Sequence, residues 1–167
     1  LNLYAYDSYE DMLLNRINPE MGTWPPYRRD LLFERSSFSV AGTQVGDSVV
    51  IEISSGRQRE LNVAGTVHDM NVWPANMFPQ LSGYVSMETL GWLGLPGTYN
   101  QLEILTKAEF DNLAKLERVA DELQERLERN GVSVDSIGVR EPGEHWARET
   151  TETFTLILSL IGFFSLI

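Results

Sequence analysis

Apolar and polar residues alternate in several short stretches of the chain, a spacing typical of half-buried β-strands. The expected strands cover residues 1–5, 30–35, 49–53, 60–67, 83–85, 101–105 and 132–139. The strands at 49–53 and 60–67 flank a Ser-Ser-Gly turn, which predicts a β-hairpin. Between residues 21 and 27 the consecutive prolines Pro25 and Pro26 exclude a regular helix or a central strand.

Helical spacing appears twice. One apolar stripe, with members three and four positions apart, is formed by Leu113, Leu116, Ala120, Leu123 and Leu127. We expect this helix to end at Gly131, because glycine tolerates the left-handed conformation of a helix end. With the strands on either side, the helix predicts a βαβ unit. A shorter helix is expected over residues 87–93, between Ser86 as its N-cap and Gly94.

Residues 154–167 form an apolar run that contains no charge. At ~1.5 Å per residue the run spans about 21 Å, short of the ~30 Å hydrocarbon core of a bilayer. A run this short is usually a buried core helix, and that interpretation stays open. The alternative is the start of a transmembrane helix. The small residues Thr155, Ser159, Gly162 and Ser165 favour it, because small residues suit close helix packing in membranes.

Together these elements predict an α+β fold with a membrane-entering end. We expect a βα lobe made of residues 1–38 and 99–153, with a small β-rich lobe, residues 39–98, inserted in it. Residues 154–167 are expected to be the truncated start of a transmembrane helix. The flank before this run has no excess of basic residues, which weakly favours an extracytoplasmic side for the preceding domain.

Charge and composition narrow the functional classes. The formal net charge is −11, so the surface repels phosphate backbones and we expect no nucleic-acid partner. The chain has no cysteine, which excludes disulfides, thiolate metal sites and a cysteine nucleophile. Its 167 residues suffice for one domain or for two small lobes that share a core.

Motifs that carry chemistry are few. The sequence has neither a glycine-rich phosphate loop nor a Gly-x-Ser-x-Gly elbow. His68 and Asp69 could supply half of a metal site, which Asp47 or His145 would complete. A soluble metal-dependent hydrolase would use such a site. Adjacent polar loop residues more often stabilise a turn. We therefore assign no catalytic residue, no cofactor and no metal ligand, and keep the hydrolase as an alternative.

Two loops rich in aromatic residues and proline are candidates for a contact surface. Such loops often pack as plugs, but an exposed apolar loop contacts a partner protein or a lipid substrate. The residues that we assign to this surface are Trp24, Pro25, Trp73, Pro74, Met77 and Phe78.

Several motifs follow one another in a distinctive order. They are Leu-Leu-Phe-Glu-Arg-Ser-Ser at 31–37, Val-Gly-Asp-Ser-Val at 45–49, a strand ending Val-x-Gly-x-Val at 60–67, and Gly-Tyr-Val-Ser-Met-Glu-Thr-Leu at 83–90. The βαβ unit and the apolar run come next. In this order they resemble the extracytoplasmic, MacB-like periplasmic core domain of FtsX-like permeases, the family of the MacB exporter and the lipoprotein-releasing permeases.

The resemblance implies a multi-pass parent protein in the cell (inner) membrane. One membrane helix precedes such a domain and three follow it, and relative to the family domain this chain begins late. The domain itself holds no catalytic residue, because a separate cytoplasmic ABC ATPase hydrolyses ATP. The implied partners are the membrane part of a dimeric permease, the ATPase and an extracytoplasmic adaptor protein.

The expected function is mechanical. A polar helix at about residues 142–153 that continues into the apolar run would relay ATP-driven motion to a substrate or partner outside the membrane. The alternative is a membrane-tethered sensor or interaction domain without an ATPase.

Overall fold

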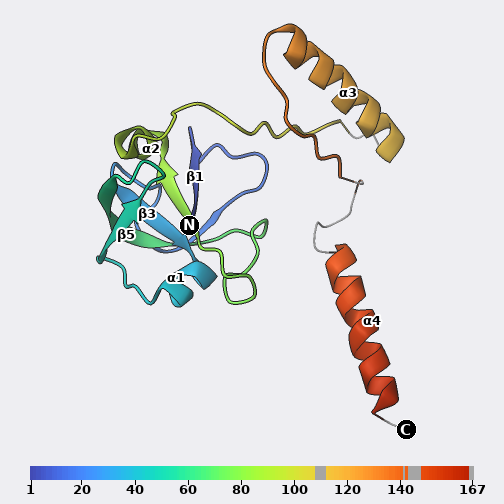
Figure 1. Cartoon of the computed structure of the whole chain (residues 1–167), viewed down its shortest axis with the longest axis horizontal. Helices are drawn as coiled ribbons and strands as arrows, with labels where there is room; N and C mark the ends of the chain where they lie inside the picture. Colours follow the sequence, from blue (N-terminus) through green and yellow to red (C-terminus); the bar gives the residue numbers. More distant parts are fainter. Residues whose placement is uncertain (108–111, 141, 143–147, 166–167) are drawn as a thin grey trace. The chain divides into compact units, whose positions relative to one another are not determined.

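The computed structural model describes residues 1–107, 112–140, 142 and 148–165. It divides into two units, Leu1–Glu103 and Ile104–Ile167, each of which is described by itself. The described residues form six strands and four helices, so the α+β class predicted from the sequence is confirmed (Figure 1).

All six strands lie in one mixed sheet in the first unit (Figure 1). The strands are β1 (Asn2–Tyr6), β2 (Asn18–Gly22), β3 (Asp30–Glu34), β4 (Ser48–Glu52), β5 (Gln58–His68) and β6 (Ser82–Ser86). Their order is β1-β6-β3-β5-β2, and β4 also pairs with β5. The β1–β6 and β3–β5 pairs are parallel, whereas β3–β6, β2–β5 and β4–β5 are antiparallel. The predicted hairpin is the β4–β5 pair.

Two short helices belong to the same unit, and both are capped. In α1 (Arg35–Ala41) the Glu34 carboxylate accepts the Ser36 N–H, and the helix ends at Gly42 with φ 66°. In α2 (Met87–Leu93) the Ser86 hydroxyl accepts the Thr89 N–H, and Gly94 ends the helix in the left-handed conformation. The boundaries predicted for α2 are therefore confirmed.

The middle of the sheet, around β3, β5 and β6, is buried on both faces, and successive residues of these strands point to opposite sides. On one face Leu31, Phe33, Leu61, Val63, Val85 and Leu93 form a buried cluster, against which side chains of α1 and α2 pack. On the other face the cluster is Tyr9, Ile17, Leu32, Ala64, Val67 and Tyr84, covered by Met12 and Trp24 from the segment between β1 and β3. Burial on both faces explains why β3 is apolar at three consecutive positions.

The sheet crosses the boundary expected at residue 38. Residues 1–38 supply β1, β2 and β3, and residues 39–98 supply β4, β5 and β6, yet all six strands share one sheet. A boundary at residue 38 would separate β3 from both of its neighbours, β5 and β6. The division observed in the chain lies instead after Glu103.

The βαβ unit predicted for residues 101–139 is wrong in its strands and right in its helix. Helix α3 (Leu113–Arg129) begins after Asn112, whose side chain accepts the Lys115 N–H, and Gly131 follows with φ 81°. Neither residues 101–105 nor residues 132–139 form a strand. Alternation marks a segment that could be half-buried, but a strand needs a neighbour for its backbone hydrogen bonds, and none pairs with these segments in the described chain.

The helix α4 (Arg148–Phe164) joins the charged flank to the apolar run in one continuous element (Figure 1). From Thr151 to Ser165 every residue is exposed. Within the described residues, no helix is both long enough and apolar enough to cross a membrane.

A close contact between two glycines holds β2 against β5. A Cβ atom added to Gly65 would lie 2.1 Å from the Met21 carbonyl oxygen, and one added to Gly22 would lie 2.0 Å from that of Ala64. Gly22 also has φ 86°, which favours glycine. The approach of the two backbones therefore depends on the absence of both side chains.

We predict that Gly65→Ala lowers the free energy of unfolding by about 1–3 kcal/mol, because the added methyl group must push β2 away from β5. The matched control is Gly91→Ala in α2, where an added Cβ meets nothing within 4 Å and helix propensity favours alanine by about 0.5–1 kcal/mol. Chemical denaturation measures both. Equal stability of the two variants would contradict the contact.

Candidate functional site

The six residues of the expected contact surface come from two loops, which pack in different ways. The Trp24 ring lies 5.2 Å from the Tyr9 ring in an edge-to-face arrangement, and Pro25 is half-buried. Trp24 therefore helps to cover the sheet. In the other loop the rings of Trp73 and Phe78 lie 4.7 Å apart, and Phe78 is 44% exposed.

The exposed part of the surface is a single loop, Met70–Gln80, which we call the apolar loop. Met70, Trp73, Met77 and Phe78 are its exposed large apolar side chains. The loop is held by a tight turn, because the Pro74 carbonyl accepts the N–H groups of Met77 and Phe78 at 3.0 and 3.1 Å. It remains a candidate contact surface, and so do the half-buried Trp24 and Pro25.

The side chains of His68 and Asp69 serve different neighbours. His68 Nδ1 lies 3.6 Å from Glu34 Oε1, and its Nε2 lies 3.3 Å from Arg35 Nη2. Asp69 is buried, accepts the Tyr84 hydroxyl at 2.8 Å and accepts the Asn71 N–H at 2.8 Å. Neighbouring residues of an extended chain point to opposite sides, so their side chains do not converge.

Nothing in the described chain brings three metal-ligating side chains together. Asp47 accepts the Gln44 N–H in the turn before β4, and His145 lies outside the described residues. Burial, followed by the charge of Asp69, raises the pKa of the Tyr84 phenol far above its usual value, so the phenol stays a hydrogen-bond donor to Asp69. The same two causes raise the pKa of Tyr6 to about 12.

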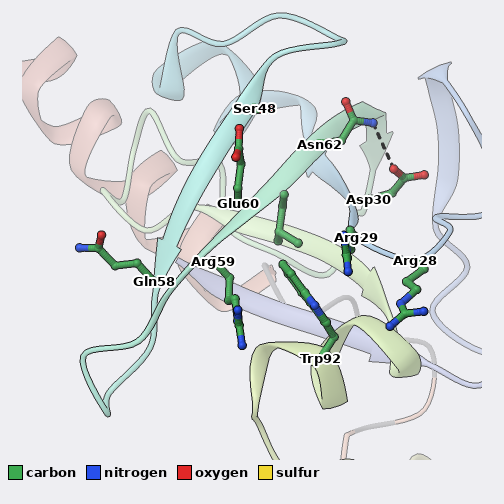
Figure 2. Close-up of a pocket in the computed structure, with 10 residues that line it drawn as sticks. Arg28, Arg29, Asp30, Ser48, Gln58, Arg59, Glu60, Asn62 and Trp92 are labelled. Atoms are coloured by element: carbon green, nitrogen blue, oxygen red, sulfur yellow. Dashed lines mark hydrogen bonds between the residues drawn. The ribbon is translucent and has the colours of Figure 1, made fainter.

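A second candidate site is a hollow of about 550 Å³ beside the first half of β5 (Figure 2). Its lining residues are Arg28, Arg29, Asp30, Ser48, Gln58, Arg59, Glu60, Leu61, Asn62 and Trp92. We call it the arginine–tryptophan hollow, after the guanidinium groups of Arg29 and Arg59 and the Trp92 ring. The guanidinium carbon of Arg29 lies 4.7 Å, and that of Arg59 5.2 Å, from the centre of this ring. Both distances allow a cation–π interaction.

Three elements position these side chains. Trp92 lies in α2 and Arg59 in β5, and Arg29 directly precedes β3. Arg29 adopts φ 65°, a left-handed conformation that costs a non-glycine residue roughly 1–2 kcal/mol. Its N–H donates to Thr89 Oγ1 at 3.0 Å, and its carbonyl accepts the Asn62 N–H at 2.9 Å. These two bonds hold the strained backbone in place.

The charges of the hollow are incompletely neutralised. Arg28 forms an ion pair with Glu88 at 3.3 Å. Among the described residues, by contrast, neither Arg29 nor Arg59 has a carboxylate within 4.0 Å of its guanidinium nitrogens. Arg59 Nε is moreover buried without a hydrogen-bond partner. Two free guanidinium groups are unusual in a chain with a net charge of −11.

Within the described residues, no strand pairs with the edge of β5 that faces this hollow before Asn62. β3 pairs with β5 only from Asn62 onward. The N–H of Asn62 points to the β3 side, toward the Arg29 carbonyl, and the N–H of Val63 points to the β4 side, toward the Asp47 carbonyl. Because backbone groups alternate along a strand, the N–H of Glu60 points to the β3 side, where β3 has not yet begun.

The hollow was not among the sites expected from the sequence. The sequence contains one indication of it. In an otherwise acidic chain, Arg28 is next to Arg29 and Arg57 is two positions before Arg59. Their role becomes visible only in the structure, where α2 brings Trp92 beside Arg29 and Arg59.

The first unit is a mixed-sheet α+β unit that carries the apolar loop and the arginine–tryptophan hollow, and the second unit contains an exposed apolar helix. The chain matches no family model, and no curated protein or solved structure matches it.

We predict that Asp69→Ala lowers the free energy of unfolding by about 1–3 kcal/mol, because the buried Tyr84 hydroxyl loses its acceptor. Asp135→Ala, at an exposed position, is the matched control and should change stability little. Thermal unfolding is measured with and without added Zn²⁺ and Mg²⁺. An unchanged stability together with a metal-dependent rise in Tm of the native protein would instead support a metal site at Asp69.

Proposed function

We propose that this protein is the extracytoplasmic domain of an ABC transporter permease, which relays ATP-driven motion to a substrate or partner outside the membrane. In this proposal the apolar part of α4 is the start of a transmembrane helix. The observation that carries the proposal is the exposure of that apolar part. The order of the motifs, which resembles that of FtsX-like permeases, adds support.

The apolar side chains of α4 are more stable in a nonpolar environment than in water. Eight large ones are each at least 45% exposed: Phe154, Leu156, Ile157, Leu158, Leu160, Ile161, Phe163 and Phe164. Full burial of one such side chain stabilises by about 1.5–3 kcal/mol, so transfer of all eight from water to hydrocarbon is favourable by on the order of 10 kcal/mol. Three consecutive positions, 156–158, already point to all sides of a helix, so a single flat partner surface cannot cover them.

The polar side chains within the apolar run are satisfied by the helix itself. The hydroxyls of Thr155 and Ser159 donate to the carbonyls four residues earlier, at 2.8 and 2.7 Å, and that of Ser165 donates to the Gly162 carbonyl at 2.8 Å. A hydroxyl that is bonded in this way does not need water. The described part of α4 from Phe154 therefore suits a hydrocarbon environment.

The relay depends on the continuity of α4. The helix crosses from Thr153 to Phe154 without a break, so a tilt or shift of its apolar end moves its polar end as well. Residues 132–139 form no strand, and the relay that we propose therefore begins at α4 rather than at the sheet.

The proposal assigns a place to each partner. The membrane domain of a dimeric permease surrounds the apolar end of α4, and a cytoplasmic ABC ATPase supplies the motion. A substrate or an adaptor protein outside the membrane contacts the apolar loop, whose Met77 side chain is 58% exposed. The domain hydrolyses nothing itself.

A membrane-tethered sensor or interaction domain is the second candidate, because the same exposed helix would anchor it. The complete reading frame distinguishes the two. Four membrane helices and a neighbouring ATPase support the permease, whereas a single membrane helix supports the sensor.

We predict that two glycines inserted between Thr150 and Thr151 uncouple transport from ATP hydrolysis in the complete permease, because they interrupt the stiff helix. Two alanines inserted at the same place are the matched control, since they add the same length and keep the helix. Transport and ATPase stimulation are measured in proteoliposomes. If the glycine variant transports as well as the alanine variant, the relay is contradicted.

A further inference from the structure

We propose that the arginine–tryptophan hollow binds a carboxylate group carried by an extended peptide segment of a partner protein. The inference goes beyond the proposed function and is independent of α4, because the hollow lies wholly within the first unit. The observation behind it is the combination of two unpaired guanidinium groups with a free strand edge (Figure 2).

Electrostatics favour an anion in this hollow. The guanidinium carbons of Arg29 and Arg59 flank one ring, so they lie at most about 10 Å apart, comparable to the Debye length of ~10 Å in 0.1 M salt. The two like charges therefore repel each other. A carboxylate at the edge of the ring, within reach of both guanidinium groups, relieves that repulsion and accepts charge-assisted hydrogen bonds from them.

The balance of charges favours a carboxylate over a phosphate. Three arginines line the hollow, together with the acidic residues Asp30 and Glu60, which leaves one net positive charge. The ion pair with Glu88 further reduces the contribution of Arg28. A singly charged carboxylate matches this surplus better than a doubly charged phosphate, whose charge exceeds it.

The strand edge favours a peptide over a small organic acid. Beside Glu60, β5 presents backbone groups toward the hollow on the side where β3 has not yet begun. An extended peptide can pair with such an edge and so add a short strand, while its acidic side chain reaches the guanidinium groups. The strained backbone of Arg29 fits this role, because it holds the side chain over Trp92 before any ligand arrives.

Nuclear magnetic resonance tests the proposal on the ¹⁵N-labelled 167-residue chain in neutral detergent. The probes are acetyl-Val-Thr-Glu-Thr-Val-amide, the same peptide with Gln in place of Glu, and inorganic phosphate. We expect saturable shifts of the Trp92 indole N–H and the Glu60 amide with the Glu peptide, and at least tenfold weaker binding of the Gln peptide.

Variants test the roles of the guanidinium groups. Arg59→Gln should weaken binding of the Glu peptide at least tenfold. Arg29→Gly should do the same while preserving the fold, since glycine suits φ 65°. Arg118→Gln on α3 removes an exposed guanidinium and should leave binding unchanged.

Three outcomes would overturn the proposal. They are the absence of any saturable shift, equal binding of the Glu and Gln peptides, and tighter binding of phosphate than of the Glu peptide. The last would identify the hollow as a phosphate site.

Discussion

The strand β5 pairs with three neighbours, and the rest of the first unit depends on this arrangement. β4 takes its first half, β2 takes its second half, and β3 runs parallel to it along the other edge. Leu61 and Val63 then lie in one buried cluster and Ala64 and Val67 in the other. Because β3 pairs with β5 only from Asn62 onward, the same arrangement leaves the first half of β5 without a strand on the β3 side. The arginine–tryptophan hollow forms at this edge.

Local signals predicted the elements better than their arrangement. Ser86 and Gly94 fix α2 through groups within a few residues, and Gly131 ends α3 in the same way. β2 was missed because its pairing depends on the contact between Gly22 and Gly65, which are far apart in the sequence. The alternation at 101–105 and 132–139 predicted strands for which the described chain supplies no neighbour.

Sites, like elements, could be predicted where they depend on neighbouring residues and not where they depend on the arrangement of distant ones. The composition of the apolar loop marked it as a candidate surface but left packing and exposure open, because large apolar side chains beside prolines suit either. The burial of Trp24 against Tyr9 could not be predicted, because it depends on how the segment before β3 folds over the sheet. The hollow also lay beyond sequence reasoning, since its residues come from α2, β5 and the residues around the start of β3. The packing of Trp24 and the hollow both depend on residues that are distant in the sequence and close in space, which the residue pattern does not show.

The environment of α4 is the central claim, and spin labelling in lipid vesicles tests it most directly. The chain has no cysteine, so Leu156→Cys, Ile157→Cys, Leu158→Cys and Ser159→Cys each label one position, and together they sample every side of the helix. The account predicts high oxygen accessibility and low accessibility to a water-soluble nickel complex at all four positions. Accessibility to the nickel complex on one side of the helix only would show a helix lying on a surface and would contradict the account.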